Sequence, residues 1–221
     1  MERREHYPVW DLPTRLSHWA IALLVLAQFG SGLFGILPMD SHLWCGYALL
    51  VALLFRILWG FVGSRSARFS HFLRGPGAVA AYARTLFSPQ PSRWPGHNPL
   101  GGWSIVLMLA LALAQCVTGL FTGAIDLSGP LAERVARSTA RAAGDWHELL
   151  YWPLLLLVLL HISAALFHLL HKGENLVKPI FGHGRLALER DPGLAFAGPL
   201  RALLVLAIAL GVVAAVVVGL P

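Results

Sequence analysis

The segment DWHELLYWPLLLLVLLH, residues 145–161, decides how the chain must fold. It is rich in leucine, nearly uncharged, and carries one histidine near each end, His147 and His161. Such a run suits a lipid environment, in which a histidine is unfavourable and is usually functional. The segment therefore indicates a membrane helix that holds two functional imidazoles.

Composition extends this reading to the whole chain. Of 221 residues, 57% are hydrophobic and 13% are charged, whereas soluble domains carry about 25% charged residues. A bilayer is spanned by about 20 apolar residues, and five stretches qualify: 16–37, 43–62, 102–124, 146–170 and 202–220. We therefore expect an all-α integral membrane protein, with no soluble domain and no internal repeat.

The net charge of +6 indicates orientation rather than nucleic-acid binding. Basic residues gather before the first span and in the second and fourth connections, at Arg3, Arg4, Arg15, Arg65, Arg68, Arg74, Arg84, Arg93, Lys172, Lys178, Arg185, Arg190 and Arg201. The other two connections hold only Arg134, Arg137 and Arg141. The positive-inside rule then predicts a cytoplasmic N-terminus and a periplasmic C-terminus. The three outer arginines form either a solvated face or a contact for an acidic partner.

Local signals predict where the helices begin. Pro13 and Thr14 suit the start of the first helix, and Asp40 or Ser41 would cap a second helix that begins at His42.

The connections carry further expectations. GAVAAYARTLF (77–87) predicts a short amphipathic helix at the membrane surface. GPLAERVARSTARAAG (129–144) predicts a separate short helix from Pro130, and residues 179–200 are expected to be a plain linker.

The spacing of the two histidines predicts two separate centres. Fourteen residues separate His147 from His161, which is about 21 Å along a helix with a net rotation of about 40°. The two side chains share one face at different depths, so no single metal ion can bind both. Each centre then needs a second ligand from another helix.

The topology supplies those second ligands. His42 lies at the outer end of its helix, as does His147, and His18 lies in the inner turns of the first helix. Two pairs of histidines on neighbouring helices are what two b-type haems require. Spacing alone leaves His161 and His168 open as inner ligands, because the first helix can place His18 at either level.

Neighbouring residues fit a haem. Gly32 and Gly46 share the faces of His18 and His42, and glycine lets a flat ring approach the backbone. Arg56, fourteen residues after His42, either pairs with a propionate or extends to the surface. No C-x-x-C-H occurs, so haem would be held non-covalently. With both axial positions filled, the iron would transfer electrons and bind no substrate.

The motifs LPTRLSHW, SHLWCGYALL, FRILWGFVGS and WHELL…LLHISAALFHLLHKGENLVK resemble the bacterial cytochrome b561 and nickel–iron hydrogenase cytochrome b family. The resemblance covers residues 7–182. It implies a four-helix transmembrane bundle in the bacterial inner membrane, two haem b groups and exchange with quinone. It also implies the ligands, which are His18, His42, His147 and His161. His168 and His171 then become candidates for a quinone or propionate site, against a plain interfacial role.

We therefore expect a dihaem cytochrome domain over 1–182 and a linker with an additional transmembrane helix over 183–221. The chain would be an electron-transfer subunit rather than a complete enzyme. It would lie in membrane lipid and connect quinone to a periplasmic hydrogenase, another dehydrogenase or a c-type cytochrome. The rival interpretations are a haem-free anchor or small transporter, and direct oxidation of a small species such as superoxide.

Overall fold

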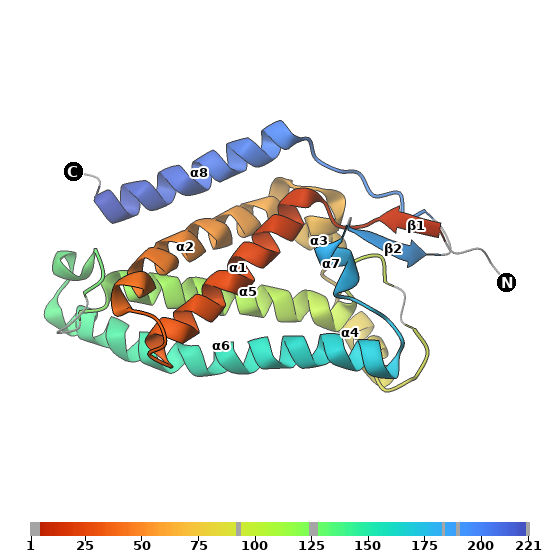
Figure 1. The fold of residues 1–221 in the computed structure, drawn as a ribbon, viewed down its shortest axis with the longest axis horizontal. Helices are drawn as coiled ribbons and strands as arrows, with labels where there is room; N and C mark the ends of the chain where they lie inside the picture. Colours follow the sequence, from red (N-terminus) through yellow and green to blue (C-terminus); the bar gives the residue numbers. More distant parts are fainter. Residues whose placement is uncertain (1–4, 92–93, 124–127, 183, 189–190, 220–221) are drawn as a thin grey trace. The chain divides into compact units, whose positions relative to one another are not determined.

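The computed structural model describes residues 5–91, 94–123, 128–182, 184–188 and 191–219. Outside these ranges lie four arginines of the charge pattern and the ends of two predicted spans: Arg3, Arg4, Arg93, Arg190, Ala124 and Leu220. The described chain is mostly helical (Figure 1).

The elements follow one another as β1 (Glu5–Pro8), α1 (Leu12–Gly32), α2 (Met39–Val62), the 3-10 turn η1 (Arg65–Ala67), α3 (Phe69–Phe72), α4 (Pro76–Arg84), α5 (Pro99–Phe121), the 3-10 turn η2 (Ala132–Arg134), α6 (Arg137–His171), α7 (Lys178–Phe181), β2 (Arg185–Leu188) and α8 (Pro199–Val218).

The predicted helical membrane fold is confirmed. Within the described residues, α2, α5, α6 and α8 are long and apolar enough to cross a membrane. The 21-residue helix α1 occupies the first predicted span but is not among these four. It carries polar side chains that the other spans largely lack, at Ser17, His18, Gln28 and Ser31.

The chain forms two compact units, and each is built from three segments. The strand-containing unit comprises the chain up to Leu16, Leu58–Leu107 and Leu157–Ala202. The helical unit comprises Ser17–Ile57, Met108–Leu156 and the chain from Leu203 onward.

In the strand-containing unit, β1 and β2 pair antiparallel, from Glu5 opposite Leu188 to Pro8 opposite Arg185. Val9 and Trp10 then donate their backbone N–H groups to the carbonyl of Gly184, at 2.7 and 2.9 Å. The expectation of a plain linker over 179–200 is therefore wrong. A four-residue strand whose partner lies near the other end of the chain leaves no local sequence signal.

In the helical unit, α2, α5 and α8 share one apolar cluster. Leu50, Leu120 and Val213 are its buried residues, with Tyr47 and Leu131 among those packed around them. The C-terminal helix α8 is thus packed against α2 and α5 in this unit.

Helix α5 begins three residues before the predicted span of 102–124. Asn98 Oδ1 accepts from Gly101 N at 2.7 Å, and Pro99 is the first residue of α5, which is the favoured place for proline. The short helix predicted over 77–87 is confirmed by α4, which begins one residue earlier, at Pro76, and ends at Arg84.

Two other helix starts were predicted wrongly. Helix α2 begins at Met39, so Asp40 and Ser41 lie in its first turn instead of capping it. The negative charge of Asp40 in the first turn interacts favourably with the helix dipole. No separate helix begins at Pro130: a 3-10 turn covers Ala132–Arg134, and one continuous helix runs over Arg137–His171. Its first turns lack an apolar face, which made them look independent of the span.

Asp11 ties the start of α1 to the end of α2 within the strand-containing unit. Its Oδ1 accepts from Thr14 N at 2.8 Å, and its Oδ2 accepts from Trp59 Nε1 at 3.0 Å. Trp59 is fully buried, and Asp11 is 8% exposed. One carboxylate therefore caps a helix and satisfies a buried indole.

We expect Asp11→Ala to lower the free energy of unfolding by about 1–3 kcal/mol, because it removes an N-cap and leaves a buried donor unpaired. The thermal midpoint of the purified protein in detergent measures this. Asp11→Asn, which keeps an oxygen for Thr14, should lose less. An unchanged midpoint in Asp11→Ala would show that this carboxylate is dispensable for the fold.

Candidate functional site

Two histidines face each other in the helical unit. His42 lies in the first turns of α2 and His147 in α6, and their ring centroids are 6.0 Å apart with ring planes at 79°. With metal–nitrogen bonds of about 2 Å, two imidazoles on opposite sides of one iron have centroids roughly 6 Å apart. The predicted outer pair is therefore brought together at a separation that suits one iron between the rings.

The hydrogen bonds of His42 define which ring nitrogen is available to a metal. Its Nδ1 lies 2.9 Å from Ser31 Oγ, and that hydroxyl also lies 2.9 Å from the carbonyl of Ala27. A carbonyl only accepts, so the Ser31 hydroxyl donates to Ala27 and accepts from the Nδ1–H of His42. Nε2 then carries the lone pair that a metal needs.

The imidazole of His147 carries its proton on the same ring nitrogen, Nδ1. Its Nδ1 lies 2.9 Å from the carbonyl of Gln115 and 3.2 Å from Thr118 Oγ1. The carbonyl can only accept, so Nδ1 carries the proton and Nε2 the lone pair. Metal-bound histidines commonly donate their second ring N–H in this way. Both residues of the pair thus fit axial ligation of haem through Nε2.

Each of these rings packs against a glycine. A Cβ added to Gly32 would lie 2.9 Å from His42 Cε1, and one added to Gly119 would lie 3.0 Å from His147 Cε1. Any larger residue at either position would displace the imidazole. Sequence reasoning selected Gly32 as a site residue, favoured interhelical hydrogen bonding for Thr118, and did not single out Gly119 or Ser31.

A short repeat in the sequence contains all of the missed residues. AQFGSGLF (27–34) in α1 and its following turn matches AQCVTGLF (114–121) in α5. The expectation of no internal repeat is therefore wrong at this scale. In both copies the glutamine, the hydroxyl residue and the glycine are spaced i, i+3 and i+4, which places them on one helix face.

The remaining haem candidates on α2 lie in the same unit. A Cβ on Gly46 would lie 3.1 Å from Gln28 Nε2, so this glycine accommodates the side chain of the first repeat copy. Arg56 is 6% exposed, so it is buried within the unit.

The predicted inner ligands belong to different units. His18 is half-buried in the helical unit, where its ring meets Trp19 edge-on at 5.2 Å. His161 belongs to the strand-containing unit and is exposed.

The C-terminal end of α6 holds a second polar cluster, within the strand-containing unit. His168 Nε2 lies 2.9 Å from Tyr82 Oη, and its Nδ1 lies 2.8 Å from the carbonyl of Ala164. Lys172 Nζ donates to the carbonyl of Thr85 at 3.1 Å. Tyr82, His168 and Lys172 are each at most 5% exposed. Both ring nitrogens of His168 are therefore engaged.

His171 completes the contact between the end of α6 and the segment after α4. Its Nε2 lies 2.8 Å from the carbonyl of Phe87, and its ring stacks on Phe167 at 4.9 Å.

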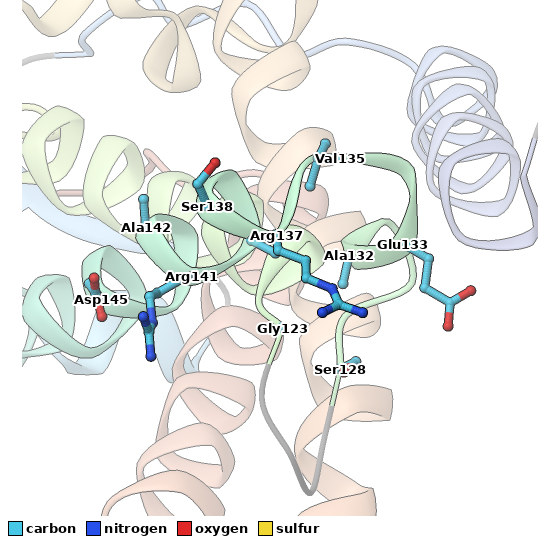
Figure 2. A pocket seen from close by; sticks show the side chains of 11 residues that line it. Gly123, Ser128, Ala132, Glu133, Val135, Arg137, Ser138, Arg141, Ala142 and Asp145 are labelled. Carbon is cyan, nitrogen blue, oxygen red and sulfur yellow. The ribbon is translucent and has the colours of Figure 1, made fainter.

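A pocket of about 980 Å³ opens beside the start of α6 in the helical unit (Figure 2). Arg137 extends across it, and Arg141 lies next to Asp145. The lining ends at Asp145, two residues before His147. The pocket carries both charge signs, since Glu133 and Asp145 accompany the two arginines.

The chain matches the prokaryotic cytochrome b561 family over residues 9–183. Three of its relatives are each named as a probable Ni/Fe-hydrogenase B-type cytochrome subunit. The protein of Azotobacter chroococcum mcd 1 is 25% identical over 83% of this chain and 90% of the relative. That of Rhizobium leguminosarum bv. viciae is 25% identical over 86% and 93%. That of Cupriavidus necator is 26% identical over 72% and 78%.

We found no solved structure that matches the chain. The family match covers most of the sequence, including both histidines of the facing pair. The apolar helices and the geometry of that pair agree with it. The chain therefore belongs to the prokaryotic cytochrome b561 family, as a b-type cytochrome that transfers electrons in the membrane through haem b.

Proposed function

We propose that this cytochrome carries two haem b groups and passes electrons between a periplasmic redox protein and the quinone pool. The observation that carries the proposal is the facing pair of His42 and His147, 6.0 Å apart, with each Nδ1 proton held by a neighbouring acceptor. Haem supplies a one-electron redox centre, and these two residues would hold it through Nε2. Because His42 and His147 would both hold the haem, this site would supply electron transfer and no binding position for a substrate.

For the inner haem we propose His18 and His161 as ligands. His161 follows His147 by fourteen residues on one continuous helix, so the two sites would be about 21 Å apart along α6. The engaged ring nitrogens of His168 favour His161 as the ligand. The burial of Arg56 supports its role as partner of a propionate.

We place the quinone site near the buried cluster of Tyr82, His168 and Lys172. Reduction of a quinone to a quinol consumes protons as well as electrons, and this cluster offers a hydroxyl, an imidazole and an ammonium group. His171, bonded to the same connecting segment, would stabilise it.

The electron donor that we propose is a periplasmic hydrogenase, because the relatives are named as hydrogenase cytochrome subunits. Another dehydrogenase or a soluble c-type cytochrome is the alternative donor. The pocket beside Arg137 and Arg141 is the surface that we assign to this contact, since its lining reaches Asp145, two residues before the proposed outer ligand in the sequence.

We further propose that the N-terminus is cytoplasmic, following the distribution of basic residues, and that α8 is an addition to a haem domain of residues 1–182. The family match ends at residue 183, and α8 lies beyond it.

Haem content provides the direct test. The purified protein should contain two b haems with a reducible b-type spectrum. His42→Ala and His147→Ala should each lose one haem, because a single axial ligand remains. His161→Ala should lose the other, while His168→Ala keeps both. A folded parent without haem would favour the anchor or transporter interpretation, and loss of a haem in His168→Ala would replace His161 in the ligand set.

Quinone reduction tests the inner cluster. In the fully reduced protein, Tyr82→Phe should slow haem reoxidation by a soluble quinone by about 100-fold, the usual scale of a lost proton donor. Both haems should be retained. Trp94→Phe is the matched control. The Trp94 ring contacts the Tyr82 ring edge-on, with the ring centroids 6.3 Å apart, and tryptophan has no hydroxyl group that could donate a proton. An unchanged rate in Tyr82→Phe would remove this cluster from the quinone site.

Orientation is tested with reporter fusions. Alkaline phosphatase fused within the connection between α5 and α6 should be active, because that connection is expected in the periplasm. The same enzyme fused between α4 and α5 should be inactive. The reverse pattern would invert the proposed topology.

A further inference from the structure

We propose that Ser31 and Thr118 are positioning residues that fix the two axial imidazoles of the outer haem and lower its reduction potential. The proposal rests on the dihaem function proposed above. It concerns a pair of matching contacts, one in each copy of the repeated segment of residues 27–34 and 114–121.

Both hydroxyls are built into their helices in the same way. Ser31 Oγ lies 2.9 Å from the carbonyl four residues earlier, at Ala27, and Thr118 Oγ1 lies 2.9 Å from that of Ala114. Each hydroxyl proton is thus committed to the helix backbone. The oxygen lone pairs then face the following histidine, so each hydroxyl can only accept from the imidazole.

The glycine after each hydroxyl makes this contact possible. Gly32 and Gly119 leave room for the imidazole within about 3 Å of where a Cβ would be. The side chain one residue earlier can then reach Nδ1. The two residues therefore act together: the hydroxyl accepts a hydrogen bond from the ring N–H, and the glycine leaves the space that the ring occupies.

An acceptor on Nδ1–H makes the imidazole a stronger base toward iron. A more basic ligand stabilises the ferric state over the ferrous state, so the potential falls. It also stops rotation of the ring, which preserves the 79° angle between the two planes. Ligand planes that cross near a right angle give low-spin ferric haem a highly anisotropic EPR signal.

The two contacts differ in a way that can be tested. Among the described residues, Ser31 Oγ is the one hydrogen-bond acceptor for His42 Nδ1, whereas His147 Nδ1 has both Thr118 Oγ1 and the carbonyl of Gln115. Removing the Ser31 hydroxyl takes away the hydrogen-bond acceptor of His42 Nδ1. Removing that of Thr118 leaves a backbone acceptor that no substitution can delete.

The experiment is a redox titration with EPR spectroscopy on the purified dihaem protein and its Ser31→Ala, Thr118→Val and Ser31→Thr variants. In Ser31→Ala we expect one haem to shift to higher potential and to change its EPR signal, with two haems still bound. Thr118→Val should shift the same haem less. Ser31→Thr, which restores a hydroxyl, should return the potential toward the parent value.

Thr122→Val is the matched control. Its hydroxyl donates to the carbonyl of Thr118 at 3.0 Å but bonds neither histidine, so both haems should keep their parent potentials. Loss of the outer haem in Ser31→Ala, with retention in Ser31→Thr, would also support positioning.

Two further outcomes separate this inference from the function on which it rests. If Ser31→Ala keeps two haems with parental potentials and EPR signals, the hydroxyl serves only the helix and the inference is wrong. If the parent holds no haem, or if His42→Ala removes none, the proposed function fails instead.

Discussion

The fixed proton position on two imidazoles is the constraint around which the helical unit is arranged. In an apolar environment a neutral histidine must place its one N–H somewhere, and an unpaired donor there is costly. His42 and His147 both donate from Nδ1 to neighbouring helices. That choice leaves the lone pair of each imidazole on Nε2, and the two ring centroids lie 6.0 Å apart. The hydrogen bonds at Nδ1 would therefore leave Nε2 of both rings for the proposed haem.

Other polar side chains of the helical unit also form hydrogen bonds both within their own helix and to a neighbouring helix. Ser31 and Thr118 satisfy their own protons within α1 and α5 before they contact a histidine. Gln115 Nε2 donates to the carbonyl of His147 at 2.7 Å. Ser31, Thr118 and Gln115 thus connect their own helices to the histidine-bearing helices, which satisfies many of the polar groups that apolar helices must carry. Among the described residues, the buried Oε1 atoms of Gln28 and Gln115 have no hydrogen-bond partner.

Sequence reasoning could reach those features that one helix displays by itself. The fourteen-residue spacing of His147 and His161 and the glycine at position 32 depend on local periodicity. The pairing of β1 with β2 depends on a partner near the other end of the chain, and the continuous helix over Arg137–His171 was missed because its first turns lack an apolar face. The contacts of Gly119 and Thr118 with His147 were missed for another reason. Their signal, the repeat of residues 27–34 in 114–121, was present in the sequence and needed comparison of the chain with itself.

The two proposed haem sites would differ in the residues that their helices supply. Arg56 follows His42 by fourteen residues, as His161 follows His147, so α2 carries an arginine where α6 carries a histidine. The two helix pairs match at the outer site, where each contributes a hydroxyl, a glycine and a histidine. They differ fourteen residues further along each helix, where α2 supplies no histidine, and His18 of α1 is the proposed second ligand of the inner haem. A cationic side chain favours the ferrous state of a nearby haem, so a haem whose propionate pairs with Arg56 would have a raised potential.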